Sequence, residues 1–381
     1  MKENLIIFNT EDILKNFCNS NNNYFYKKLE NSFLLEKKKM GRYGGISSFI
    51  LPNSIKIKPS TIGLIIGEGY LKNIFVIASC SKEIIDNMLE FLSQFNIDLK
   101  FYIEIASKNI NYSFVNKSRS FWKGITKRYI EKVRLRNNFN NTTEHGTLHI
   151  CYYNVTFSKL LKFIVIKSLN IIEKSNQFII DYLKGILAGE GNVNVKKKTN
   201  CVYMIRISAT KELDRSRYKE LLEKIGIKIT CKDMPTISKE EGKKLGWKTD
   251  KGRAGAVIIS RWENFLKILT IDLLELNKDK QDKFIKYFVN NKFTKQFLDF
   301  QYFIDKKFTM KDAQVAFNLR ARYVNRLKTL ERLGYLNKEF IRKFGNNNMY
   351  LYILNKKYLE VYNKLNNLNR LDGSPSSKSN F

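Results

Sequence analysis

The sequence predicts an α+β protein made of two pseudo-symmetric halves and a small C-terminal domain. Two nonamers, Thr61 to Gly69 (TIGLIIGEG) and Leu183 to Gly191 (LKGILAGEG), share one pattern at a constant offset of 122 residues. A repeat at this spacing indicates two copies of a structural unit. Strand-like and helix-like segments follow each nonamer in a similar order, and the pattern changes beyond Phe293.

Glycines occupy equivalent positions in the two nonamers: Gly63 and Gly67 in the first, Gly185 and Gly189 in the second. A glycine inside a helix costs about 1 kcal/mol relative to alanine, so this pattern needs a compensating reason. Glycines four residues apart lie on one helix face, where a second backbone can approach closely. We therefore expect the two nonamers to form helices that pack side by side.

A glutamate follows the second glycine of each copy, at Glu68 and Glu190, and Gly69 and Gly191 come next. We expect each final glycine to end its helix as a C-terminal cap. The two carboxylates then converge at one end of the helix pair. Like charges held close together are costly unless a cation lies between them, and carboxylate oxygens suit Mg²⁺. The pattern indicates a metal site for phosphodiester chemistry.

Both nonamers resemble the signature helix of the LAGLIDADG homing endonucleases in their single-chain, double-motif form. Glu68 and Glu190 fall on the last acidic position of the motif, which in the family binds catalytic metal ions. The segment from Gly44 to Ser60 also resembles the lead-in to the first motif. The sequence departs from the family at Ile66 and Ala188, which replace an earlier acidic residue whose role is structural.

The resemblance implies two units of mixed αββαββα order, each with a saddle-shaped antiparallel sheet whose open face lies against double-stranded DNA. It implies a site-specific double-strand break at a long asymmetric target by metal-dependent hydrolysis, with Mg²⁺ or Mn²⁺ as cofactor, in support of intron homing. It also assigns further residues to the site: Gly67 and Gly189 to the metal, and, for the polarisation of water, Lys174 at the end of one repeat and either Lys278 or Lys280 at the end of the other.

Composition independently favours a nucleic-acid partner. The chain has 68 Lys and Arg against 36 Asp and Glu, for a net charge of +32, and such a field steers a protein towards polyphosphate. It has neither a run of eighteen apolar residues nor a signal-peptide pattern. Its five cysteines have no C-x-x-C spacing, which is typical of reduced thiols. We expect a soluble, intracellular monomer, from a prokaryote or an organelle, without a membrane partner.

The first half has three further elements that the residue pattern predicts: a strand from Leu71 to Ser79, a helix from Ser81 to Gln94 and a strand from Asp98 to Ala106. The following segment, Lys117 to Arg136, carries eight basic residues and one acid. Its near-helical spacing predicts a helix that either clamps DNA or packs its aromatic stripe on the core. His145, His149 and Cys151 are neighbours in sequence, but they lack further ligands for a metal site.

The second half repeats the plan, with these expected elements: a hairpin from Asn192 to Ala209, a helix from Lys211 to Ile225, strands from Ile227 to Lys232 and Arg253 to Ser260, and a helix from Trp262 to Leu269. Alternate side chains of the strands would face the duplex. The candidates for DNA contact in this half are Lys196, Lys197, Lys198, Arg206 and Arg253.

Beyond Phe293 the sequence resembles a winged helix-turn-helix domain. Thr309 and Asp312 form a capping box, a short helix reaches Phe317, and a second helix is expected from about Ala321 to Leu333. A glycine- and asparagine-rich tip and a strand would complete the wing. The second helix would carry four basic residues towards a groove of DNA: Arg320, Arg322, Arg326 and Lys328.

The expected domains are an N-terminal extension, two LAGLIDADG halves, the winged helix and a disordered tail, at residues 1–40, 41–175, 176–292, 293–368 and 369–381. Two other functions remain open. A DNA-binding regulator could keep the fold without cleavage, although retention of Glu68 and Glu190 argues against it. An RNA maturase that assists splicing, with intron RNA as its partner, would use the same fold and charge.

Overall fold

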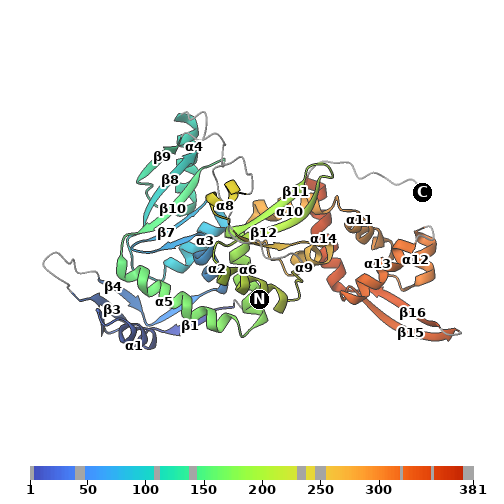
Figure 1. Cartoon of the computed structure of the whole chain (residues 1–381), viewed down its shortest axis with the longest axis horizontal. Coiled ribbons are helices and arrows are strands. Elements are labelled where there is room, and N and C mark those ends of the chain that lie inside the picture. The colour runs from blue at the N-terminus through green and yellow to red at the C-terminus, as the bar shows by residue number, and fades with distance from the viewer. Residues whose placement is uncertain are drawn as a thin grey trace.

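The computed structural model describes residues 4–38, 48–106, 112–136, 144–229, 237–244, 255–317, 321–344 and 347–371. Its mixture of helices and strands confirms the predicted α+β class. Helices α2 (Pro59–Glu68) and α6 (Asn176–Glu190) lie at the centre, between two halves that each carry a sheet (Figure 1). The C-terminal elements lie beyond the second half.

The N-terminal segment contains one helix and five strands: β1 (Ile6–Asn9), α1 (Thr10–Ser20), β2 (Tyr24–Lys28), β3 (Ser32–Lys37), β4 (Ser48–Pro52) and β5 (Ser54–Ile57). Strand β1 pairs with β5, and β3 pairs with both β2 and β4. The expected boundary at residue 40 therefore falls between paired strands. Residues before this boundary do not form a separate extension, because β1 and β3 pair with strands β5 and β4, which lie after it.

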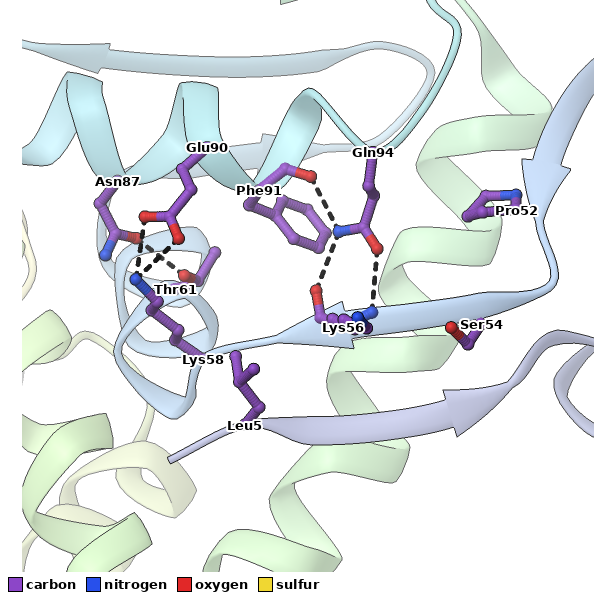
Figure 2. Close-up of a pocket in the computed structure, with 10 residues that line it drawn as sticks. All are labelled: Leu5, Pro52, Ser54, Lys56, Lys58, Thr61, Asn87, Glu90, Phe91 and Gln94. Carbon is purple, nitrogen blue, oxygen red and sulfur yellow. Dashed lines mark hydrogen bonds and ion pairs between the residues drawn. The ribbon is translucent and has the colours of Figure 1, made fainter. Parts of the chain in front are cut away.

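Polar contacts attach this segment to the first half. The side chain of Gln94 accepts from the backbone N–H of Lys56 on β5 and donates to its carbonyl, both at 2.9 Å (Figure 2). The Lys58 ammonium pairs with Glu90 at 2.8 Å. These residues line a cleft of about 530 Å³ between β5 and α3 (Lys82–Leu92). The cleft is thus bridged by the protein's own polar groups.

The first half contains a five-stranded sheet in the order β6-β7-β10-β8-β9. Its strands are β6 (Gly69–Leu71), β7 (Phe75–Ser79), β8 (Lys100–Ala106), β9 (Lys132–Arg136) and β10 (Thr147–Tyr152). Alternate residues of β7 and β8 are buried, as half-exposed strands require. Helices α3 and α5 (Val155–Ile172) pack against this sheet, where Phe157 contacts Phe75 edge to face.

One strand departs from the antiparallel sheet that was expected. Strand β9 runs parallel to β8, and α4 (Tyr112–Thr126) forms the crossover between them. A parallel neighbour needs such a long connection. Without α4 and β9, the order from α2 to α5 is αββαββα. The pair α4 and β9 is therefore an insertion into the expected unit.

Helix α4 packs part of its aromatic side on the core, which is one of the two expected alternatives. Trp122 is fully buried, and its indole N–H donates to the carbonyl of His145 at 2.9 Å. The His145 ring stacks on Phe121 at 3.8 Å. The helix ends at Thr126, so residues 132–136 form a strand where the sequence favoured a helix.

The second half follows α6 with a three-stranded antiparallel sheet in the order β11-β12-β13. Its elements are β11 (Gly191–Lys196), β12 (Cys201–Ser208), α7 (Glu212–Lys224), α8 (Lys239–Lys244), β13 (Ala256–Ile259) and α9 (Trp262–Thr270). Residues 227–229 of the strand expected from Ile227 to Lys232 are not in a strand, and its other residues, 230–232, lie outside the described ones.

The C-terminal region continues with helices and one small sheet of order β14-β16-β15. Its elements are α10 (Lys278–Phe288), α11 (Lys292–Asp299), η1 (Phe300–Phe303), β14 (Phe308–Thr309), α12 (Met310–Ala316), α13 (Ala321–Arg332), β15 (Leu336–Phe344), β16 (Asn347–Leu354) and α14 (Lys356–Leu371). The predicted capping box is present: Thr309 and Asp312 exchange side-chain to backbone hydrogen bonds at 3.2 and 2.7 Å.

Helix α14 packs back on α9 of the preceding half and on α10. The hydroxyl of Tyr358 donates to the carbonyl of Phe297 at 2.8 Å, and the Lys364 ammonium pairs with Asp272 at 2.7 Å. The C-terminal region therefore shares a core with the second half. The tail expected from residue 369 begins inside α14, and its last ten residues, 372–381, lie outside the described ones. No described helix has both the length and the apolar character needed to cross a membrane.

Candidate metal site and nucleic-acid interface

Helices α2 and α6 meet backbone to backbone through two glycines. A Cβ atom added to Gly63 would lie 2.8 Å from the backbone nitrogen of Ile186, and one added to Gly185 would lie 2.9 Å from that of Leu64. Real Cβ atoms do not approach so closely, so any larger residue would push the helices apart. The structure thus places both glycines where the repeat indicated close packing.

Each helix ends at its glutamate and continues directly into a strand. Gly69 and Gly191 follow Glu68 and Glu190 with φ values of −87° and −72°, which are extended rather than left-handed. Each glycine is the C-cap residue of its helix, as expected, and donates its backbone N–H to the carbonyl of Ile65 or Leu187. Glycine is needed for another reason: an added Cβ would strike the carbonyl oxygen of the preceding helical turn.

The two glutamates lie across the helix pair, each against a glycine of the opposite helix. A Cβ atom on Gly189 would lie 2.9 Å from Cγ of Glu68, and one on Gly67 would lie 3.5 Å from Cγ of Glu190. Both glutamate side chains are half-buried. The carboxylates therefore converge at the C-terminal end of the pair, as the spacing predicted.

The environment of both carboxyl groups disfavours their charged form. Burial raises the pKa of Glu68, and burial together with the charge of Glu68 raises the pKa of Glu190. Lys280 lowers both. A divalent cation would relieve this repulsion.

The donor set fits a hard cation such as Mg²⁺ or Mn²⁺, because carboxylate oxygens are its preferred protein ligands. Within the described part of the chain, no group of three or more His, Cys, Asp or Glu side chains could hold a metal ion. A cation between Glu68 and Glu190 would thus take further ligands from water and phosphate, as Mg²⁺ usually does.

Lys280 caps the end of α6. Its ammonium donates to the carbonyl oxygens of Leu187, Ala188 and Gly189, at 3.2, 2.5 and 2.7 Å. The last carbonyls of a helix have no partner within the helix, so this cation satisfies them and opposes the negative end of the dipole. Gly189, which the family resemblance assigned to the metal, already accepts a hydrogen bond from Lys280 through its carbonyl.

The position of Lys280 is fixed by the first turn of α10. Asn277 is the N-cap residue: its side chain accepts from the Lys280 N–H at 3.1 Å and donates to the carbonyl of Ala188 at 3.3 Å. Burial lowers the pKa of Lys280, while the charges of Glu68 and Glu190 raise it. A lysine of this kind titrates closer to neutrality than an exposed one.

The other two lysines assigned to the site lie elsewhere. Lys278 is exposed at the first position of α10 and has its side chain in solvent. Lys174 precedes α6, so it lies at the opposite end of that helix, about 22 Å from Glu190 by the rise of the helix. The assignment of Lys174 is wrong because the glutamates lie at the C-terminal end of the pair.

Two residues beside the glutamates were missed by the sequence analysis. Asn277 is one, and its N-cap position before a helix was a readable signal. Cys80, whose residue surface is exposed, is the other: desolvation of its thiol raises the pKa, Asp279 and Glu68 raise it further, and Lys280 lowers it. Nothing in the sequence marks Cys80, because Asp279 and Lys280 are some two hundred residues away along the chain.

One of the two helices that carry the glutamates lies in a segment that matches a known protein family. Residues 177–287 match a LAGLIDADG-like domain. The matched span contains Glu190 and Lys280, whereas Glu68 lies before it.

Solved structures of I-DmoI are also similar to the chain. I-DmoI in complex with DNA and Mn has a TM-score of 0.32 and 15% identity, over 56% of this chain and 94% of that one. Mesophilic variants of the homing endonuclease I-DmoI give the same TM-score and identity over 57% and 96%. The search of curated proteins finds no match.

The segment that matches the LAGLIDADG-like domain carries several of the basic residues assigned to DNA. Lys196, Lys197 and Lys198 are exposed at the turn between β11 and β12. Arg206 is half-buried on β12, in register with Asn192, on the face opposite the core. Three assignments have no described side chain: Arg253 and Arg320 lie outside the described residues, and so does the side chain of Arg322.

Arg326 does not face solvent, contrary to its assignment as a DNA contact. Only 9% of its surface is exposed, and its guanidinium lies over two rings, 4.5 Å from the centroid of Trp262 and 4.2 Å from that of Phe293. Planar guanidinium groups stack well on aromatic faces. The same helix exposes Lys328, which stays available for DNA.

Proposed function

We propose that the chain is a site-specific DNA endonuclease that makes a double-strand break at a long asymmetric target. The observation that carries this proposal is the placement of Glu68 and Glu190, each against a glycine of the opposite helix. The net charge of +32 supports a polyphosphate partner. The segments α2 to α5 and α6 to α9 would act as two related halves of a monomer, one for each strand.

In this proposal the two glutamates hold Mg²⁺ or Mn²⁺. The bound cation would lower the pKa of the attacking water and stabilise charge on the leaving oxygen. Lys280 holds a positive charge beside the same point, because three carbonyls of α6 fix its ammonium. This fixed charge beside Glu68 and Glu190 would help to polarise the attacking water and to stabilise negative charge that develops on phosphate oxygens.

We further propose that α11 to β16 is a winged helix-turn-helix domain that lengthens the contact with DNA. The order of α11, β14, α12, α13 and the hairpin β15–β16 supports this assignment. Exposed basic side chains on α13 and the hairpin would meet phosphates: Lys328, Arg342 and Lys343. The biological role would be intron homing.

A DNA-binding protein without cleavage is the second candidate, and one observation favours it. Lys280 already offsets part of the negative charge of Glu68 and Glu190, so the pair can exist without a metal ion. Binding to intron RNA remains compatible with the charge of the chain.

The function is tested by selecting bound duplexes from a randomised DNA library and incubating the selected duplex with Mg²⁺, Mn²⁺ or EDTA. The proposal predicts a double-strand break with either cation and intact duplex in EDTA. Selection of a defined duplex without cleavage in either cation would favour the non-cleaving protein. Failure to select any duplex, with selection from a parallel RNA library, would favour the maturase.

A further inference from the structure

The inserted strand β9 adds a row of basic side chains to the sheet of the first half. Lys132, Arg134 and Arg136 alternate along β9, and all three are exposed. Strand β9 is the edge of a sheet whose other edge, β6, begins directly after Glu68. The insertion therefore places positive charge four strands away from β6, the strand next to Glu68, across the sheet.

A column of rings supports the middle residue of this row. The rings of Tyr102 on β8 and His149 on β10 stack with centroids 4.2 Å apart and an angle of 16°. The guanidinium carbon of Arg134 lies 4.1 Å from the centroid of the Tyr102 ring. Three adjacent strands therefore contribute to one column, His149–Tyr102–Arg134.

The column lies on the face of the sheet away from the core. His149 pairs in register with Tyr102, whereas their neighbours Leu148 and Ile103 are fully buried on the other face. Helix α5 contacts β6 and β7 from the side of the core, where Phe157 meets Phe75. The basic side chains of β9 are exposed, so this row is accessible to a partner.

The charges around the column separate Arg134 from its neighbour. Arg136 pairs with Glu104 at 3.1 Å, and no carboxylate among the described residues pairs with Arg134. Burial lowers the pKa of His149, and Arg134 and Arg136 lower it further against the effect of Glu104. The environment of the column therefore disfavours a positive charge on His149 that would repel Arg134.

A guanidinium held on a ring differs from an exposed cation on a free side chain. Stacking restricts its rotamers and fixes the direction of its planar fork, so less entropy is lost when it binds. Phosphate accepts a contact from any nearby cation, but a base edge requires a fixed direction. The support of Arg134 thus favours base recognition, while Lys132, which has no such support, suits phosphate.

We propose that Arg134, positioned by Tyr102 and His149, recognises a base pair of the DNA target in the major groove. This inference rests on the proposed function. Arginine binds both acceptors of a guanine edge with its fork, so guanine is the expected base. Four strand spacings amount to about 19 Å. The guanine should therefore lie roughly six base pairs from the centre of cleavage, on the side of the first half.

The test compares target selection by the full-length chain and four variants: Arg134→Ala, Arg134→Lys, Tyr102→Leu and Lys162→Ala. Lys162 is the matched control, since it is exposed on α5, which packs on the other face of the sheet. Sequencing of selected duplexes gives the preference at every position. Thermal unfolding establishes that each variant is folded.

Arg134→Ala is expected to lower discrimination at one position by about 5- to 150-fold and leave the others unchanged. Arg134→Lys should not restore discrimination at that position, and Tyr102→Leu should weaken discrimination at the same position. Lys162→Ala should have the base preferences of the wild type. Unchanged preference in Arg134→Ala, or uniform weakening that Arg134→Lys restores, would overturn the inference while cleavage by the wild type persists. If the wild type selects no duplex, the proposed function and the inference both fail.

Discussion

Glu68 of α2 lies against Gly189 of α6, so closely that a Cβ atom on Gly189 would be 2.9 Å from its Cγ. The reciprocal contact, from Gly67 to Glu190, is looser at 3.5 Å. The carboxylates are thus positioned by the same glycine face that packs the helices. A shift of either helix along the other would therefore move Glu68 relative to Glu190.

The glycines of this face should differ in their tolerance of alanine. Gly63→Ala and Gly185→Ala place a Cβ against backbone of the other helix and should each cost about 1–3 kcal/mol or more in unfolding free energy. Gly67→Ala meets only ordinary contacts and should gain up to about 1 kcal/mol from helix propensity. Calorimetric melting temperatures measure the difference. Equal melting temperatures for Gly63→Ala and Gly67→Ala would contradict the close packing.

The carboxyl groups make the metal-free protein less stable as pH rises. Because the pKa of Glu68 is raised in the folded state, the folded protein binds its proton more tightly than the unfolded chain does. This stabilisation is present below the unfolded pKa of about 4.3 and is lost as pH rises through the higher folded pKa. Glu68→Gln should therefore be more stable than the wild type at pH 7 in EDTA. A lower melting temperature for the variant would show that Glu68 is not under electrostatic strain.

Lys280 and Lys278 form a matched pair for a pH profile of cleavage. Lys280→Met should lower the rate about a hundredfold or more. Since Lys280 lowers the pKa of both glutamates, its loss raises those pKa values and moves the acid limb of the profile to higher pH. Lys278→Met should leave rate and profile unchanged, because its side chain is exposed. The same shift in both variants would argue against a specific role for Lys280.

Arg326 and Lys328 should separate stability from DNA binding. Arg326→Ala removes a guanidinium stacked on Trp262 and Phe293 and should cost about 1–3 kcal/mol of stability. Lys328→Ala should keep the melting temperature and reduce the slope of log affinity against log salt by about one. Salt titrations of binding and melting curves measure both. A full loss of salt dependence in Arg326→Ala, without loss of stability, would reverse the assignment.

The sequence predicted what local spacing determines. The four-residue interval between glycines predicted the face through which α2 and α6 pack. The glutamate after the second glycine of each motif predicted that Glu68 and Glu190 lie at the same end of the helix pair. The alternation of apolar and polar residues predicted strand β8, and the capping box predicted Thr309 as the N-cap residue of α12. Each of these depends on residues within a few positions of one another.

Features that depend on distant contacts could not be predicted in the same way. Lys280 is selected over Lys278 by the docking of α10 on the end of α6, some ninety residues earlier. Arg326 has the character of a surface residue, and only Trp262 and Phe293 bring it inside. The basic, amphipathic pattern before Arg136 resembled a continuous helix, but pairing with β8 makes its end a strand.

The most direct test of the account is cleavage of the selected duplex in Mg²⁺ by Glu68→Gln and Glu190→Gln at saturating protein. Each substitution removes one negative charge from the candidate metal site and keeps the size of the side chain. The account predicts that both variants bind the duplex within about tenfold of the wild type and make no double-strand break. Full cleavage by either variant would show that its glutamate does not hold the cation, and would contradict the shared site.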